Sequence, residues 1–454
     1  MVSIVGFDRF LMGYTLGAHI LIVTLSISLA ILISTAEFLG IRRKDRYYEA
    51  IARRFSKALV VFFAVGTASG TVLAVELFAL WPSFMVLIGK VDILPFYYEV
   101  FAFFLEAIAL VLYVYYWEYF KNRYHHWLLS VLVAIGTVMS AVFITLINAF
   151  MNTPSGFNIS EYLKTGNITG VNPVAAFMSP SGFVEVAHVT TATFAAGAFL
   201  FLAYLAYSYI KNHDTQARIL YSKAMKITIV SGFIGIVLAG ISGDSAARTL
   251  ISLQPLKYAA IELNLHPAVD AAERLGGIMV NGAPAYFISI PHLQSILAFL
   301  SFNSKQVVPG LSQFPKSDWP PLFIHLTFDT MVGGGSLVGL FGLYLLYRMI
   351  IKRNYLNNLS LLGMVVAGVL IEVVYDSGWV TDEVGRQPWI IYNVMSVSSA
   401  ANTSPSVIPL GIGIILFYLI VVPFTFYFAH RLLQHSKIGD ELSAGVKKED
   451  VSPS

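Results

Sequence analysis

The sequence predicts an all-α fold: a polytopic membrane helical bundle with about nine transmembrane helices and a long outer loop between helices six and seven. Composition is the first observation, since 57% of the 454 residues are hydrophobic and 12% are charged. The second is a series of apolar runs that exceed the ~20 residues needed to cross a bilayer core. Because each spanning helix satisfies its own backbone hydrogen bonds, such helices add to one bundle.

Charge and cysteine content narrow the classes of function. The net charge is +3 and the basic residues are spread over several loops, which argues against nucleic acid as a partner. The sequence contains no cysteine, so disulfides, thiolate metal sites, iron–sulfur clusters and covalent haem attachment are excluded. Any cofactor must therefore be held by histidine, methionine, carboxylates or packing.

Apolar windows predict the spanning helices in chain order. The first window lacks a basic leader and a small-residue cleavage site, so we expect a permanent helix instead of a cleaved signal peptide. The nine windows cover residues 11–38, 57–82, 93–119, 127–150, 183–210, 219–243, 320–348, 358–380 and 404–430.

Loop charge predicts the orientation of the bundle. Short basic loops follow the first, third, fifth, seventh and ninth windows, so the positive-inside rule places the N-terminus outside and the C-terminus inside. We therefore divide the chain into helices one to six (1–243), an outer segment (244–318), helices seven to nine (319–435) and a polar, mobile cytoplasmic tail (436–454). The apolar content of the outer segment predicts packed structure instead of disorder.

His19 and His188 fall within predicted spanning helices, where ionisable side chains are costly and usually functional. His19 lies in the outer half of helix one, and we interpret it as a ligand or proton relay, with a structural role as the alternative. His188 lies near the outer end of helix five, where the small residues that follow it leave room for a flat cofactor. The alternative for His188 is an interface histidine near the lipid headgroups.

Met331 opens the stretch MVGGGSLVG in helix seven. Three successive helical glycines cost roughly 1 kcal/mol each relative to alanine, which indicates that a planar group or another backbone packs closely there. Most methionines only fill gaps, but Met331 shares the outer half of the bundle with His188. A His/Met pair of this kind raises the potential of a haem.

Paired carboxylates occur in two predicted helices. Glu99 and Glu106 in helix three are seven residues apart, which places them on one face and ~10.5 Å apart along the axis. They form either a proton relay or a pair held by helix–helix hydrogen bonds. Asp376 and Glu383 repeat this spacing at the outer end of helix eight, where Arg386 follows, ready to contact an anionic group such as a haem propionate.

The histidine count limits how haem could be bound. Only His19, His188 and His325 fall in the outer halves of the predicted helices or at their outer borders, whereas two haems with two histidine ligands each would need four. If haems are bound, some irons must use methionine, a carboxylate or an open position. An open position is what oxygen chemistry requires.

Several motifs taken together resemble subunit I of cytochrome bd quinol oxidases over nearly the whole chain. The most specific is GRQPW, preceded by SGWVTDE, and the nine predicted helices agree with it. The motifs are GRQPW (385–389), AFFLE (102–106), VAHVTTATFAAGAF around His188, FDTMVGGG around Met331, GDSAARTLISLQPLKYAAIE (243–262), ISIPHLQSILAFLS in the outer segment, and His19 itself.

The resemblance implies a set of cofactors and ligands. His188 and Met331 are similar to the axial ligands of a low-spin haem b, His19 to the ligand of one high-spin haem, and Glu383 to the carboxylate ligand of the other. The family's cofactors are the low-spin haem b, a high-spin haem b, and haem d or a further haem b in its place. The resemblance leaves open which high-spin position holds which haem. Trp379 is similar to a tryptophan between haems.

The resemblance also implies a quinol site, a proton path and partner subunits. Lys257 and Glu262 resemble the quinol-site pair of the outer segment, Glu99 and Glu106 the carboxylates of the proton path, and Arg386 a partner of haem propionates. The expected protein lies in a prokaryotic plasma membrane. It oxidises quinol outside, reduces O2 to water and generates a proton motive force without pumping. We expect a second membrane subunit, either subunit II or a subunit I-like chain, and leave small single-helix subunits open.

Two positions depart from the family pattern. Asp329 stands two residues before Met331, where some members carry arginine, and Glu76 lies two residues later than the usual glutamate of helix two. Two residues rotate a side chain by about 200° around a helix. The outer segment, residues 244–318, also has the shorter of the lengths that this segment has in the family.

Two other interpretations compete with a quinol oxidase. The first is a subunit I-like paralogue that transfers electrons or serves as a structural partner without reducing O2. The second is a transporter with buried carboxylates, which would explain Glu99 and Glu106 but not His188, Met331 or the arginine beside Glu383. A reduced-minus-oxidised optical spectrum separates all three.

Overall fold

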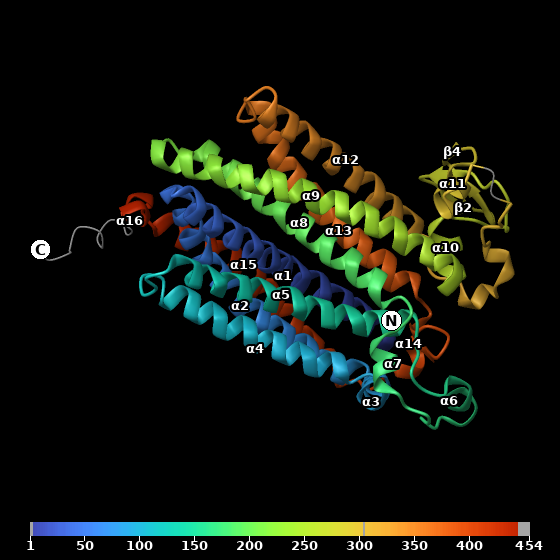
Figure 1. The fold of residues 1–454 in the computed structure, drawn as a ribbon. Helices are drawn as coiled ribbons and strands as arrows, with labels where there is room; N and C mark the ends of the chain where they lie inside the picture. Colours follow the sequence, from blue (N-terminus) through green and yellow to red (C-terminus); the bar gives the residue numbers. More distant parts are fainter. Residues whose placement is uncertain (1–2, 303–304, 444–454) are drawn as a thin grey trace, which may run out of the picture.

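The computed structural model describes residues 3–302 and 305–443, which form an elongated helical bundle (Figure 1). Within this part of the chain nine helices are long and apolar enough to cross a membrane, as the sequence predicted. They are α1 (Ile4–Arg43), α2 (Arg46–Leu80), α4 (Leu94–Tyr115), α5 (Arg123–Asn152), α8 (Gly182–Lys211), α9 (Thr215–Leu253), α12 (Ile324–Ile350), α13 (Asn358–Gly385) and α15 (Val407–His435).

Shorter elements fill the connections. The strands form three antiparallel pairs, β1 with β4, β2 with β3 and β5 with β6. The short helices are α3 (Pro82–Val91), α6 (Ile159–Thr165), α7 (Pro173–Phe177), α10 (Pro255–Ile261), α11 (Leu293–Phe299), α14 (Val397–Ala400) and α16 (Ile438–Ser443), with 3₁₀ turns η1 (Leu311–Gln313) and η2 (Lys316–Asp318). The strands are β1 (Glu273–Leu275), β2 (Ile278–Val280), β3 (Ala283–Ala285), β4 (Ile288–Ile290), β5 (Trp389–Ile391) and β6 (Met395–Ser396).

Several helices run beyond their apolar windows. The first basic loop shrinks to a tight turn in which Lys44 has a left-handed backbone and the side chain of Asp45 accepts from the amide of Tyr47, so that α2 begins at Arg46. Asn122 caps α5 in the same way, so this helix begins at Arg123. Hydropathy marks only the part of a helix that lies in lipid, because its polar ends meet water.

The outer segment begins later than predicted. Residues 244–253 are the last turns of α9, stabilised by an ion pair of 2.8 Å between Arg248 and Asp244. Gln254 ends the helix, and Pro255 opens α10 at a position where proline needs no amide hydrogen. The remaining described residues carry β1 to β4 and α11. The division of the chain into four parts stays a prediction.

The start of α1 and the short helix α16 lie at opposite ends of the bundle (Figure 1). The N-terminal end carries α3, α6, α7, α10 and the strands, whereas α16 lies at the other end. The tail prediction was wrong for its first residues, because Glu441 of α16 pairs with the buried Arg54 at 3.2 Å and with Lys57 at 2.9 Å. Residues 444–454 lie outside the described part of the chain.

Two apolar clusters form most of the core. The larger one joins α1, α2, α8 and α9 along the length of the bundle, with Phe55, Phe199 and Tyr221 buried in it. The smaller one surrounds α3 at the N-terminal end and includes Trp81. The polar side chains that interrupt this packing are the candidates for function.

Candidate functional site

His188 lies on α8, about 9 Å from the N-terminal end of that helix at 1.5 Å per residue. Its Nδ1 is 3.1 Å from the carbonyl oxygen of Ala239 on α9. A carbonyl can only accept, so Nδ1 carries the proton and Nε2 keeps its lone pair. A Cβ at Gly243 would come within 2.8 Å of the ring. Glycine at this position therefore leaves space for the imidazole.

His19 lies deeper, about 22 Å along α1, because this helix begins seven residues before its apolar window. Its Nδ1 is 2.7 Å from the hydroxyl of Ser69 on α2. That hydroxyl donates to the carbonyl of Gly66 at 3.0 Å, so it must accept from Nδ1. The Nε2 of His19 therefore also presents a free lone pair.

Met331 lies about 10 Å from the start of α12, at a depth similar to that of His188. Its sulfur packs against α13, where a Cβ at Gly378 would come within 3.0 Å of Sδ. Trp379, the next residue of α13, is partly buried against the larger core cluster. Gly378 therefore permits the close contact between α12 and α13 that holds the thioether in place.

This donor set fits haem. Ligating histidines commonly donate Nδ1–H to an oxygen acceptor, which fixes the ring and directs Nε2 at the metal, and both His188 and His19 do so. A thioether at the depth of one of these histidines supplies the second axial ligand type known for low-spin haem. Nitrogen and sulfur donors in an apolar bundle suit iron porphyrin better than hard, oxygen-seeking cations.

Glu383 and Arg386 lie at the C-terminal end of α13. Glu383 is part of the helix, which extends to Gly385, five residues beyond the predicted window. Nη2 of Arg386 donates to Oε2 of Glu383 at 2.5 Å, and Nη1 donates to the side-chain oxygens of Asn148 at 3.0 Å and Asn152 at 2.9 Å. The guanidinium therefore joins α13 to α5, and the carboxylate remains a third exposed.

Asp382 lies beside Glu383 and ties α10 to this network. It accepts from the Lys257 ammonium, from Asn148 at 2.5 Å and from Asn152 at 3.2 Å. Lys257 is 3% exposed. We call the network of Lys257, Asp382, Arg386, Glu383 and the two asparagines the paired cluster.

Glu262 does not join Lys257, although the two were predicted as one pair. Five helical residues separate them by about 140° around the axis, and Glu262 turns toward β1 and α12, where it hydrogen-bonds to Glu273. Burial raises the pKa of Glu262 well above its usual value, and Glu273 and Asp329 add to this effect. The structure thus separates the two predicted quinol-site residues.

His325 is occupied on both sides of its ring. Nδ1 lies 2.6 Å from the carbonyl of Ile261, and Nε2 lies 2.8 Å from the carbonyl of Gly276. Both ring nitrogens thus face carbonyl oxygens at hydrogen-bond distance, so neither is directed at a metal. Asp329, one turn along α12, is 3.6 Å from Nε2 and accepts from the Gly276 amide.

Glu99 and Glu106 both face α5, in agreement with their shared helical face. The Ser140 hydroxyl donates to Glu99 at 3.1 Å, whereas the Thr137 hydroxyl donates to the carbonyl of Val133 at 2.8 Å. Glu106 is 5% exposed. Gly136 lets the two backbones approach, because a Cβ there would come within 2.7 Å of the Glu106 amide. A hydrogen bond between the two helices therefore holds Glu99, and this bond does not exclude a proton relay.

Several polar groups were missed in the sequence. Asn148 and Asn152 are four residues apart in an apolar helix, and this spacing was the available signal for the paired cluster. His126 was assigned to a basic loop but lies inside α5, fully buried, with Nδ1 2.5 Å from Glu37 and Nε2 2.9 Å from the carbonyl of Tyr113. It is thus a further buried histidine of the helical bundle, with both nitrogens occupied.

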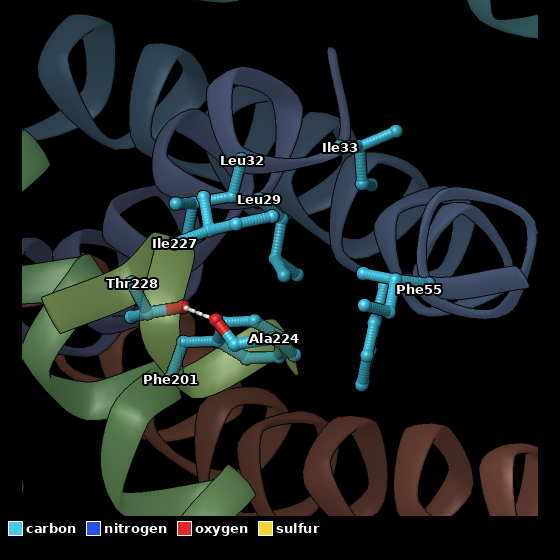
Figure 2. Close-up of a pocket in the computed structure, with 9 residues that line it drawn as sticks. Leu29, Leu32, Ile33, Phe55, Phe201, Ala224, Ile227 and Thr228 are labelled. Carbon is cyan, nitrogen blue, oxygen red and sulfur yellow. Dashed lines mark hydrogen bonds between the residues drawn. The ribbon is translucent and has the colours of Figure 1, made fainter. Parts of the chain in front are cut away.

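An apolar cavity lies between α1, α2, α8 and α9 (Figure 2). The hydroxyl of Thr228 donates to the carbonyl of Ala224 at 3.0 Å, so it offers the cavity no free donor. No predicted site residue is among its lining, which consists of Leu29, Leu32, Ile33, Ile51, Phe55, Phe201, Ala224, Ile227 and Thr228. The cavity is therefore a packing feature of the core.

Comparison with known proteins confirms the resemblance. The sequence model for cytochrome bd terminal oxidase subunit I matches residues 7–437. A Bacillus subtilis (strain 168) protein provisionally named cytochrome bd menaquinol oxidase subunit I is 34% identical over 426 residues, 93% of this chain and 92% of that protein. The cytochrome bd ubiquinol oxidase subunit 1 of the same organism is 28% identical over 86% of this chain and 84% of its own length.

A solved structure agrees with the fold. The bd oxidase from Geobacillus thermodenitrificans superposes with a TM-score of 0.90 and is 34% identical, over 96% of this chain and 99% of that chain. This likeness extends over nearly the whole chain. The chain belongs to the cytochrome bd terminal oxidase subunit I family.

Proposed function

We propose that the chain is the haem-bearing subunit of a quinol:oxygen oxidoreductase. The observation that carries this proposal is the pair of histidines, His188 and His19, each with Nδ1–H committed to an oxygen and Nε2 free. Family membership supports haem as the cofactor and quinol and O2 as the reactants. The names of relatives include both a menaquinol and a ubiquinol oxidase, so the substrate class is a membrane quinol.

Four side chains hold the haems in this proposal. His188 and Met331 hold a low-spin haem b, while His19 and Glu383 hold the two high-spin haems, one of them haem d or a further haem b. When bound, haem supplies one-electron transfer and, at an open iron position, a site for O2. Trp379, on the same helix as Glu383, would lie between the haem sites.

Arg386 fixes the Glu383 carboxylate through their 2.5 Å contact. Its Nε has no partner among the residues described, and this nitrogen is the one that remains for a haem propionate. The guanidinium thus serves as a positioning group for the carboxylate and as a counter-charge for the cofactor.

Quinol is oxidised at the outer side in this proposal. Glu262 accepts a proton from the quinol headgroup. The ammonium of Lys257 donates to Asp382, so Lys257 orients the headgroup indirectly, through Asp382. Protons for water formation enter from the inner side and pass Glu106 and Glu99. Charge is thereby separated across the membrane without pumping. The complex includes a second membrane subunit, and the N-terminus of this chain lies outside.

Oxygen uptake driven by quinol tests the proposal. The purified complex should consume O2 with a reduced quinol. His19→Ala should abolish turnover, because the histidine Nε2 at the proposed high-spin position is lost, while the low-spin bands remain. His188→Ala should abolish those bands and turnover. The matched control is His213→Ala, since His213 is an exposed loop histidine.

The possible results separate the alternatives. Low-spin bands without O2 uptake in the wild-type protein would support the electron-transfer paralogue instead. A wild-type complex without haem bands in its reduced-minus-oxidised spectrum would contradict the proposal altogether.

A further inference from the structure

Two carboxyl groups meet inside the segment that follows α9. Glu262 at the end of α10 is 7% exposed, Glu273 at the start of β1 is 9% exposed, and their side chains hydrogen-bond to each other. A carboxylate can only accept, so two carboxyl groups joined by a hydrogen bond must hold at least one proton between them. We call them the carboxyl pair.

The backbone that carries the pair is held from α12. The two ring nitrogens of His325 lie at hydrogen-bond distance from the carbonyl oxygen of Ile261, the residue before Glu262, and from that of Gly276, which follows β1. Asp329 accepts from the amide of the same Gly276. One side chain thus joins the end of α10 to the end of β1, and this contact keeps the carboxyl groups together.

The groups that face the pair differ in charge. From α12 come Asp329 and the His325 ring, from β1 comes Arg274, and from α10 comes the Tyr258 phenol. Burial, followed by Asp329, raises the pKa of Glu273 to about 7, and Arg274 acts in the opposite direction.

Asn264 provides an independent sign of a ligand. Its Oδ1 accepts from Nη1 of Arg274 at 2.5 Å, which places the amide beside the guanidinium that faces the carboxyl pair. Its Nδ2 is buried with no partner in residues 3–302 and 305–443, although the residue is only 2% exposed. An unpaired buried donor costs about 1–3 kcal/mol. A ligand oxygen at this position would remove that cost.

We propose that Glu262 and Glu273 form a proton-sharing carboxyl pair that takes up the protons released as a quinol headgroup is oxidised beside Asn264. This inference rests on the proposed function and adds Glu273 to it. Glu262 contacts the headgroup, whereas Glu273 acts through Glu262 and is a positioning residue.

The protons and electrons balance as follows. Oxidation of a quinol to a quinone breaks two O–H bonds and releases two protons and two electrons. The first proton goes to the free carboxylate of the pair, which then holds two. The pair loses one proton toward the outer solvent before it accepts the second from the headgroup. The two electrons would pass one at a time to the low-spin haem that His188 and Met331 would hold, since haem accepts single electrons.

The pH dependence of quinol oxidation tests the pair. In the wild-type complex, kcat/KM should fall on the acid side as the pair becomes doubly protonated, with a midpoint near the Glu273 pKa of about 7. Glu273→Gln removes the charge that raises the pKa of Glu262 and can donate a hydrogen bond to its carboxylate. The acid limb should therefore move to lower pH by about one unit. The kcat should fall about tenfold, because a more acidic carboxyl is a weaker base.

Asp270→Asn is the matched control. Asp270 is an exposed carboxylate three residues upstream with a left-handed backbone at φ 53°, which asparagine also adopts. The acid limb of kcat/KM in the Asp270→Asn complex should coincide with that of the wild type. Should Glu273→Gln fail to assemble with haem, Glu273→Asp replaces it. The shorter side chain weakens the shared hydrogen bond, and the acid limb should move in the same direction by less.

The outcomes distinguish the two levels of the account. A wild-type complex that does not oxidise quinol contradicts the proposed function. An active wild type whose acid limb is unchanged by Glu273→Gln, or by Glu273→Asp where that variant is needed, contradicts the carboxyl pair alone.

Discussion

The two ends of α10 lie in very different electrostatic surroundings. At Lys257, charges of opposite sign alternate: the ammonium meets Asp382, and Arg386 meets Glu383, with asparagine amides on the remaining oxygens. At Glu262, five residues later, the nearest carboxyl neighbours are Glu273 and Asp329. One short helix thus separates a cluster stabilised by ion pairs from one that holds protons.

This difference indicates different roles. Ion pairs with several hydrogen bonds fix side chains in one geometry, which suits the positioning of Glu383 at the end of α13. Carboxyl groups without enough cations change their protonation with pH, which suits proton uptake. The predictions below alter one side and compare it with the other.

The largest effect is expected in the paired cluster. Lys257→Met leaves the Asp382 carboxylate without its cation and should lower the free energy of unfolding by about 3–5 kcal/mol. Unfolding in detergent micelles by titration with a denaturing surfactant measures this. Lys257→Arg is the control, because it keeps the cation. If Lys257→Met and Lys257→Arg lose the same small amount, the pair does not stabilise the contact between α10 and α13.

A smaller effect is expected for the carboxyl pair as pH changes. Because the folded pKa of Glu273 is raised from 4.5 to about 7, its stabilising contribution is complete below pH 4.5 and is lost as pH rises to about 7. The free energy of unfolding should therefore fall by up to about 3 kcal/mol over this range. Glu273→Gln should flatten the curve, measured by the same surfactant titration at each pH. Equal slopes in both proteins would contradict the raised pKa.

The smallest effect concerns Arg274, the cation that faces the carboxyl pair. Its guanidinium lies 5.5 Å from the ring centroid of Phe287 and opposes the raised pKa of Glu262. Arg274→Gln should move the acid limb of kcat/KM to higher pH by about half a unit and cost less than about 1 kcal/mol of stability. The shift is opposite in sign to that of Glu273→Gln. A shift of the same sign in both variants would show that general destabilisation, not charge, moves the limb.

The membrane bundle could be predicted because the bilayer itself sets the length of each apolar run. The helix ends could not, since the turns between residues 46 and 56 are polar yet helical, and only the Asp45 cap marks where α2 begins. Capping residues such as Asn122 carry the missing information, and reading them would have placed His126 inside α5.

The candidate ligands could be named from the sequence, whereas their hydrogen-bond partners could not. The acceptor of His188 is the backbone carbonyl of Ala239, which has no sequence signature. Glu273 lies in a segment of short strands with no helical period, so nothing in the sequence brings it to Glu262. The paired cluster could be predicted only in part. The spacing of Asn148 and Asn152 was visible in the sequence, but the residues of α13 that these asparagines contact are set by tertiary packing.

The central claim is that His188, Met331, His19 and Glu383 hold iron porphyrins near the end of the bundle that carries the strands. A cryo-EM map of the purified complex tests this claim most directly. The account predicts planar density continuous with Nε2 of both histidines, with the Met331 sulfur and with the Glu383 carboxylate. Density that shows only packed side chains or lipid around these four groups would contradict it.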